Sequence, residues 1–130
     1  MFEPIVRALI RNEKGEVLLV QRAKKPAQGK WILPGGKVEF HEKAKDAVAR
    51  EIKEELDCKF EPHFLLFDED FGSVPDKHCL VFYYTGKMTG KMKTKPDEIL
   101  AARYFSLDEI KKSPDIGFNH KEKLMEIVRQ

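Results

Sequence analysis

The sequence predicts one α/β (α+β) domain in which a mixed β-sheet lies between helices. Three observations predict this class. Short apolar runs rich in β-forming residues recur along the 130 residues, separated by turn signals. Segment 39–56 has the composition of a helix and contains no Gly or Pro. An amphipathic segment closes the chain and is expected to cover the opposite face of the sheet.

The first half of the chain predicts strands joined by a turn and a loop. The two leading apolar runs flank a short polar turn, which predicts a β-hairpin. A third, short strand runs into Pro34-Gly35-Gly36, a sequence typical of a tight turn. The long helix follows. The predicted strands are 5–11, 17–22 and 31–33. The turn is 12–15, the loop is 23–30 and the helix is 39–56.

The second half predicts further strands and two short helices. Ser106 begins a helix, with Glu109 three residues later as a capping box, and Pro114 ends that region. Asn119 caps the final helix, whose apolar residues fall on one face. The predicted strands are 64–68, 79–85 and 99–105. A loop, 71–76, separates the first two strands, and a connector, 86–96, separates the last two.

Composition is that of an ordinary soluble domain spanning residues 1–130. Hydrophobic residues make up 42% and charged residues 35%, and the formal net charge of +2 predicts no nucleic-acid partner. We find no secretion signal and no run of transmembrane length. Cys58 and Cys79 form no CxxC pair and are interpreted as buried free thiols. Together these features predict a cytoplasmic protein without membrane contact.

The long helix gathers acids beside its apolar face. An α-helix turns about 100° per residue, which places Glu51, Glu54 and Glu55 within an arc of about 100°. Glu42 and Arg50 fall on the opposite side, where water is expected. Like charges at these spacings destabilise a helix by a few tenths of a kcal/mol per pair. A hard divalent cation would offset the repulsion, because it prefers carboxylate oxygens. The neighbouring apolar residues are Val48, Ala49, Ile52 and Leu56.

These spacings form a long pattern. Gly36 is followed after five residues by Glu42, and after seven more by Arg50-Glu51-Ile52-Lys53-Glu54-Glu55-Leu56-Asp57-Cys58. The pattern resembles the signature of the Nudix hydrolases, with Asp57 where the family usually has Gly. Because the family Gly sits just past the helix end, we expect a left-handed C-cap at Asp57. The resemblance implies the Nudix α/β/α sandwich along nearly the whole chain.

The resemblance also implies a chemistry. Nudix enzymes typically cleave a pyrophosphate bond in a nucleoside diphosphate linked to another group, using Mg²⁺ or Mn²⁺. By resemblance, Glu51, Glu54 and Glu55 hold the metal together with the Gly35 carbonyl, and Glu51 or Glu55 also accepts the proton of the attacking water. Arg50 is expected to orient a carboxylate, most directly Glu51. Many family members supply a further carboxylate from downstream. Glu98 is the candidate here, with an exposed loop acid as the alternative.

Several functions stay open. Arg22 follows a strand, where it would meet substrate phosphates, or it is a solvated loop charge. The leading substrate is a small-molecule nucleotide: a nucleoside triphosphate, oxidised forms included, or another nucleoside diphosphate derivative. ADP-ribose or a nucleotide sugar is the alternative. A non-catalytic nucleotide-binding regulatory module is a second class, which the presence of Arg50 and all three acids disfavours. The sequence leaves a homodimer open.

Overall fold

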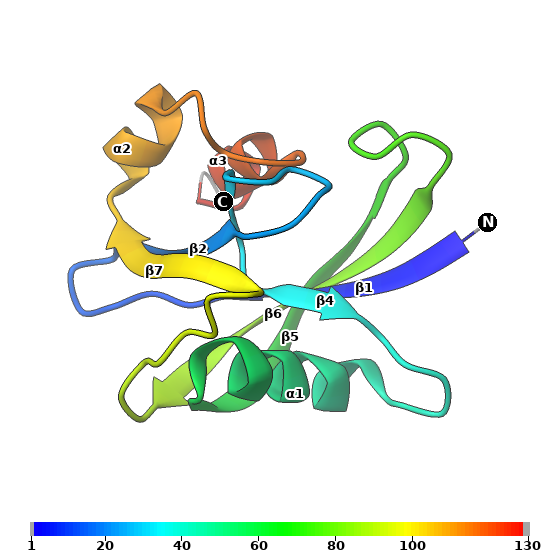
Figure 1. Cartoon of the computed structure of the whole chain (residues 1–130), viewed down its shortest axis with the longest axis horizontal. Coiled ribbons are helices and arrows are strands. Elements are labelled where there is room, and N and C mark those ends of the chain that lie inside the picture. The colour runs from blue at the N-terminus through cyan, green and yellow to red at the C-terminus, as the bar shows by residue number, and fades with distance from the viewer. Residues whose placement is uncertain (1, 129–130) are drawn as a thin grey trace.

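The computed structural model describes residues 2–128 and contains seven strands and three helices (Figure 1). In chain order the elements are β1 (Phe2–Leu9), β2 (Val17–Arg22), β3 (Trp31–Ile32), β4 (Gly35–Lys37), α1 (Ala44–Leu56), β5 (Lys59–Asp70), β6 (His78–Thr89), β7 (Ile99–Phe105), α2 (Leu107–Lys112) and α3 (His120–Val128).

The strands form two sheets, of which the larger is mixed. Its order is β4-β1-β6-β5, with β1 parallel to β6 and the other neighbours antiparallel. The smaller sheet has the order β3-β2-β7 and is antiparallel. Helix α1 lies on one side of the sheets, while α2 and α3 lie on the other (Figure 1). The predicted sandwich of a mixed sheet between helices is therefore confirmed.

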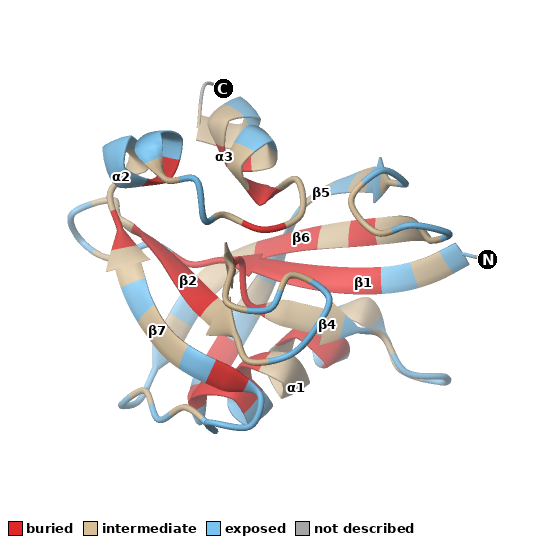
Figure 2. Cartoon of the chain, turned by 45° about the horizontal axis from the view of Figure 1, so that its top comes forward, coloured by how far each residue is buried: buried red, intermediate tan, exposed pale blue. Residues whose placement is uncertain are grey.

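The core is divided by β1 and β2 into two apolar layers. Val6 and Ala8 pack in the layer that contains the apolar face of α1. Ile5 and Leu9, which alternate with them, pack in the layer that contains Leu124 of α3. A strand that is buried on both faces has a nearly continuous run of apolar residues. The sequence shows such runs in the buried parts of β1 and β2. Figure 2 shows both strands as largely buried.

The predicted hairpin of β1 and β2 is wrong beyond its turn. The turn between the two strands forms, and Leu18 N–H donates to the Ile10 carbonyl at 2.9 Å. Beyond it the strands diverge into different sheets, because both edges of β1 are taken by β4 and β6. The register of β1 with β6 pairs Phe2 with His78, a partner far along the sequence.

Two local predictions also change. The acidic helix begins at Ala44 instead of residue 39, since His41 adopts a left-handed φ of 65° that a helix does not accommodate. The Pro-Gly-Gly segment is not a free turn: Gly35–Lys37 forms β4 and pairs with β1.

Strands β5 and β6 extend well beyond the predicted 64–68 and 79–85, because they pair with each other along most of their length. Pro62 is tolerated in β5, which lies at the edge of the sheet. The first residues of the predicted 86–96 connector therefore belong to β6.

Several other predictions are confirmed. Strand β7 has the predicted bounds, and the capping box forms between Ser106 and Glu109. Both cysteines are free, and Cys58 is buried as predicted. The prediction that Cys79 is buried is wrong, because this residue is partly exposed at the start of β6. Within residues 2–128, no helix combines the length and apolar character needed to cross a membrane.

Asp57 ends α1 in the predicted left-handed conformation, with φ 56° and ψ 34°. We expect Asp57→Gly to raise the midpoint of urea unfolding, because glycine adopts this conformation without a Cβ clash. The ion pair between Asp57 and Lys53 that is lost is exposed and contributes little. The activity implied by the resemblance should stay nearly unchanged.

The control for this prediction is Asp57→Ala, which also removes the ion pair but keeps the strained conformation. Its unfolding midpoint should fall. A collapse of activity in Asp57→Gly would instead give this residue a part in the chemistry.

Candidate active site

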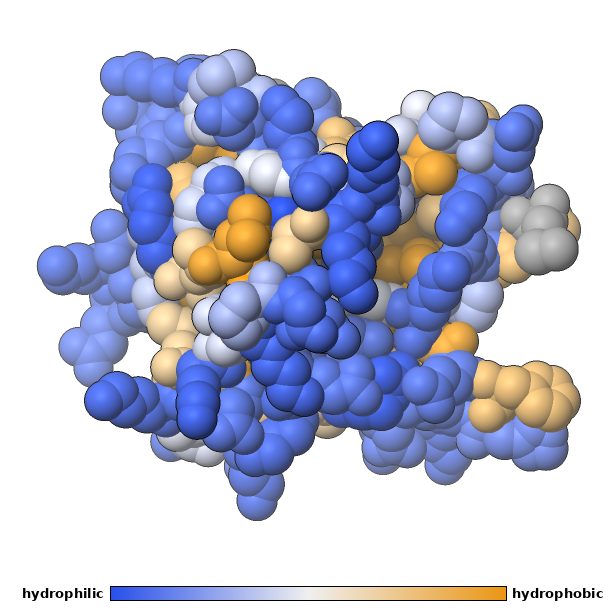
Figure 3. All heavy atoms as spheres, in the orientation of Figure 1, coloured by the Kyte–Doolittle hydropathy of each residue, from blue (hydrophilic) through white to orange (hydrophobic). Residues whose placement is uncertain are grey.

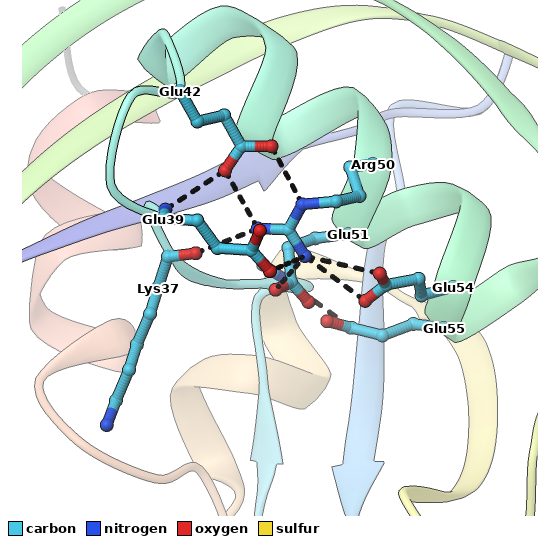
Figure 4. Close-up of polar contacts among 8 residues, drawn as sticks. Lys37, Glu39, Glu42, Arg50, Glu51, Glu54 and Glu55 are labelled. Carbon is cyan, nitrogen blue, oxygen red and sulfur yellow. Dashed lines mark hydrogen bonds and ion pairs between the residues drawn. The ribbon is translucent and has the colours of Figure 1, made fainter.

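Arg50 lies at the centre of a cluster of carboxylates (Figure 4). Its Nε donates to Glu42 at 2.8 Å, and its Nη2 donates to the other oxygen of Glu42 at 3.0 Å. Its Nη1 donates to Glu51 at 3.1 Å and to Glu54 at 3.2 Å. Nη2 also donates to the Lys37 carbonyl at 3.0 Å, which ties α1 to the end of β4. One guanidinium thus joins three acids and a strand.

Glu42 and Arg50 are partly exposed, less than the expected position in water implies. The side chains are 16% and 24% exposed, because each covers the other. Arg50 contacts Glu51 as the resemblance implies, but its bidentate partner is Glu42. This hydrogen bonding lowers the pKa of the Glu42 carboxyl and raises the pKa of the Arg50 guanidinium. Glu42 therefore holds the Arg50 guanidinium in place at the centre of the cluster.

Glu55 and Glu51 form a buried acidic pair on the inner side of the cluster. Glu55 is 6% exposed, and burial raises its pKa well above the ordinary range for glutamate. Burial also raises the pKa of Glu51, and the two carboxyls share a hydrogen bond (Figure 4). Gly35 N–H approaches a Glu55 oxygen at 3.4 Å. In the absence of another cation, the pair is disposed to hold a proton.

Gly35 and Gly36 allow β4 to pass between β1 and α1. A Cβ on Gly35 would lie 2.0 Å from the Val6 carbonyl oxygen, and its φ of 151° is rare for other residues. A Cβ on Gly36 would lie 2.6 Å from the carboxyl carbon of Glu51. These contacts explain why a Gly-Gly pair stands at a fixed distance from the acidic helix.

The donors suit a hard divalent cation. Glu51, Glu54 and Glu55 offer carboxylate oxygens, which Mg²⁺ and Mn²⁺ prefer. Within residues 2–128, however, no three acidic, His or Cys side chains already stand at metal-binding spacing. Here Arg50 Nη1 donates to both Glu51 and Glu54. The residues fit a metal by chemistry, and an ion would have to compete with this guanidinium.

A pocket of about 260 Å³ adjoins the cluster. The two share Gly36, whose backbone abuts Glu51, and Lys37, whose carbonyl accepts from Arg50. Figure 3 shows a hollow with apolar atoms on its floor between hydrophilic walls. The pocket brings together five cationic side chains and two carboxylates, with apolar and aromatic residues between them. The charged residues are Arg7, Arg22, Lys25, Lys37, Lys77, Glu3 and Asp70.

Arg22, the predicted substrate-binding residue, lies in this pocket. Its Nε donates to the Pro26 carbonyl at 2.6 Å, and its guanidinium lies 5.5 Å from the ring centre of Phe118. Burial lowers its pKa. The alternative of a freely solvated loop charge does not fit these contacts.

Glu98 makes no polar side-chain contact with the cluster in the described residues. It is exposed in the turn before β7, and its backbone carbonyl accepts from Ala23 N–H at 3.0 Å. Its carboxylate has no polar partner among residues 2–128. The structure thus leaves the catalytic assignment of Glu98 without a contact that supports it.

The pocket residues without an assigned role in the sequence include Arg7, Phe118 and His120. Arg7 carried a usable signal, because a charge inside a strand that is apolar on both faces requires a partner. Phe118 and His120 carried none, since the connection after α2 and the first residue of α3 bring them to the pocket.

Comparisons with known proteins identify the family of the chain. The family model described as NUDIX domain matches residues 1–126. The chain is 38% identical to putative nudix hydrolase 1 of Caenorhabditis elegans, over 82% of this chain and 30% of that protein. It is 35% identical to an 8-oxo-dGDP phosphatase of Homo sapiens, over 78% of this chain and 31% of that protein. Other relatives are named for 8-oxo-dGTP and ADP-ribose. The chain spans about a third of the length of the first relatives it matches.

Solved structures extend the likeness to the whole fold. The MutT protein of Methanosarcina mazei Go1 superposes with a TM-score of 0.87 at 30% identity, covering 98% of this chain and 94% of that one. The α/β/α layers described above are thus a shared architecture. By its family match and its structural likeness, this chain belongs to the Nudix family.

Proposed function

We propose that this chain is a metal-dependent pyrophosphohydrolase that cleaves a pyrophosphate bond in a nucleotide. The observation that carries the proposal is that the carboxylate cluster and the cationic pocket meet at Gly36. Carboxylates that suit Mg²⁺ or Mn²⁺ lie on one side, and a pocket rich in cations lies on the other. A polyphosphate bridging them would find a place for metal chemistry and a place for its own negative charge.

The acids are assigned to the reaction as follows. Glu51, Glu54 and Glu55, with the Gly35 carbonyl, hold one or more Mg²⁺ or Mn²⁺ ions. When bound, such an ion neutralises phosphoryl charge and lowers the pKa of a bound water. Glu51 or Glu55 accepts a proton from the attacking water. Arg50 keeps the carboxylates in position.

The phosphate chain is assigned to the cations beside the cluster. Lys37 stands where the pocket meets the acids. Arg22, which Pro26 and Phe118 hold on the pocket wall, is assigned to a contact with the substrate. Glu98 stays a prediction as a further catalytic carboxylate, since no polar contact ties it to the cluster. The cytoplasmic location and the oligomeric state also stay predictions.

A nucleoside triphosphate, including oxidised forms, or another nucleoside diphosphate derivative is the proposed substrate. Relatives named for 8-oxo-dGDP and 8-oxo-dGTP favour it. A relative in Methanocaldococcus jannaschii named for ADP-ribose supports the alternative of ADP-ribose or a nucleotide sugar. A regulatory module without catalysis is disfavoured, because the site retains all three acids and Arg50.

The first test is a panel of nucleotides, nucleotide sugars and ADP-ribose with Mg²⁺ or Mn²⁺, scored by product identity. We expect a nucleoside triphosphate to give its monophosphate and pyrophosphate, and no turnover after a chelator removes the metal. AMP plus ribose 5-phosphate as the main products would favour the alternative substrate. Binding across the panel without any product would point to the regulatory module.

The second test removes charge from the cluster while keeping its shape. Glu54→Gln and Glu55→Gln are each expected to lower kcat by about 100-fold or more, since they remove proposed metal ligands. The fold should persist, which urea unfolding would verify, and the rise in Tm caused by Mg²⁺ should weaken in both variants.

Glu13→Gln is the matched control for these variants. This glutamate lies exposed in the turn between β1 and β2, away from the cluster, and its loss should leave kcat unchanged. Activity of Glu54→Gln and Glu55→Gln within a few-fold of the parent would refute the assignment of the acids.

The third test disturbs geometry alone. Gly36→Ala places a methyl group against the Glu51 carboxyl, which must move. Because displacement of a catalytic group by about 1 Å can slow a reaction about 100-fold, we expect a loss of that order in kcat. Gly72→Ala is the control, because its Cβ would meet nothing within 4 Å. Equal activity of the two variants would show that the position of Glu51 is unimportant.

A further inference from the structure

Arg7 is a buried charge on β1 with few protein partners. It is 7% exposed, and its Nη1 donates to the Leu33 carbonyl at 3.2 Å. Glu55 attracts it through space without a hydrogen bond. A guanidinium has five N–H donors, no acceptor, and does not give up its proton. Within residues 2–128, most of these donors therefore have no protein acceptor.

The remaining donors of Arg7 open onto the pocket. Among the described residues, no side-chain nitrogen or oxygen is both fully buried and unpaired. The nitrogens of Arg7 that lack a partner therefore keep some accessible surface, and Arg7 lines the pocket. A largely desolvated charge gains most from a ligand that brings acceptors to it.

Phe118 fixes Arg7 relative to Arg22. Both guanidiniums lie 5.5 Å from the centre of its ring, the distance of a cation–π contact. The backbone of Phe118 has a left-handed φ of 53°, which is rare for an aromatic residue. At Gly117 a Cβ would lie 2.9 Å from Ile32, so the connection before α3 is tightly packed. The two sets of donors are thus positioned before any ligand arrives.

His120 adds a third donor to the same wall. It is 3% exposed, and its Nδ1 accepts the backbone N–H of Leu33 at 3.0 Å. A nitrogen that accepts a hydrogen bond carries no proton, so the neutral ring holds its proton on Nε2. Burial and the two nearby arginines lower the pKa of His120 well below its usual range, in agreement with a neutral ring.

The carboxylates of the pocket are already engaged. Glu3 is held by Lys37 at 2.8 Å and by Lys77 at 3.1 Å. An oxygen of Asp70 accepts two backbone N–H groups of the loop that follows it. The Tyr83 hydroxyl and the Asn119 amide can each both donate and accept, so they do not discriminate. The charged and imidazole groups that face a ligand here are therefore mainly donors.

We infer that Arg7, Arg22 and His120 form a base-reading wall that selects a 6-oxopurine nucleotide over a 6-aminopurine nucleotide. The inference rests on the proposed function, because it specifies the base of the same substrate. Guanine presents O6 and N7 as acceptors to a guanidinium. Adenine has an amino group at position 6, which is a donor and would face the N–H donors of the guanidinium without forming a hydrogen bond. 8-Oxoguanine keeps the 6-keto oxygen.

A substrate phosphate would satisfy the same donors, and this reading makes a different prediction. A phosphate contact strengthens the binding of every nucleotide alike, whereas a base contact changes the ratio between bases. The ratio of affinities for IMP and AMP isolates the base contact, because the two ligands share their phosphate and sugar and differ in the base at position 6.

The test measures the dissociation constants of IMP and AMP by calorimetry in the presence of EDTA, and kcat/KM for ITP and ATP with Mg²⁺. For the parent protein we expect the 6-oxopurine to be favoured by about tenfold or more in both measurements. Arg7→Gln should bring both ratios close to one, because an amide can pair with adenine. Arg22→Gln, at a more exposed position, should lower the ratios even if Arg7→Gln fails to fold.

Arg103→Gln is the matched control. Arg103 lies on β7 beside Glu109 and Phe105, does not line the pocket, and should leave the ratios unchanged. Equal values for the two purines in the parent would overturn the inference. So would arginine variants that weaken both purines equally. Absence of hydrolysis throughout the nucleotide panel would instead remove the proposed function, whatever the ratio of IMP to AMP binding.

Discussion

The pairing of Arg50 with the carboxylates of α1 and its preceding loop governs the rest of the site. Helix geometry places Glu51 and Glu54 close together, and each such pair repels by a few tenths of a kcal/mol. An exposed ion pair contributes about 0.2–1 kcal/mol, and a bidentate, partly covered pair such as that of Arg50 with Glu42 lies toward the stronger end. Arg50 therefore offsets the local repulsion without any bound ion, and the acids remain together.

This pairing also links the helix to the sheet. Arg50 reaches the Lys37 carbonyl at the end of β4, and β4 in turn lies against β1 through glycines that leave no room for side chains. The alternation of β1 then decides which groups reach which side. Val6 enters the core beneath α1, while Arg7 faces the pocket. A single short strand thus sets the separation between the acids and the cations.

Local features were predictable from the sequence because neighbouring residues determine them. The face of acids on α1, the capping box at Ser106 and the left-handed Asp57 all depend on spacings of a few residues. The hairpin of β1 and β2 was mispredicted because β1 finds its partners elsewhere, and the energy of those pairings is not visible in the local pattern. The pairing of Arg50 with Glu42 was missed because the prediction placed Glu42 inside the helix. Glu42 in fact lies in the loop before α1, from which its side chain reaches Arg50.

The pocket was the least predictable part, since its wall combines β1, β2 and the connection before α3. Under the proposed function, its position explains how an acidic centre can accept a polyanion. Carboxylates alone would repel phosphates, and a basic pocket alone would bind them without placing the reacting bond near a proton acceptor. With both meeting at Gly36, attraction on one side offsets repulsion on the other, although the whole chain carries a net charge of only +2. The local distribution of charge therefore matters more than the net charge: carboxylates lie on one side of β4 and cations on the other.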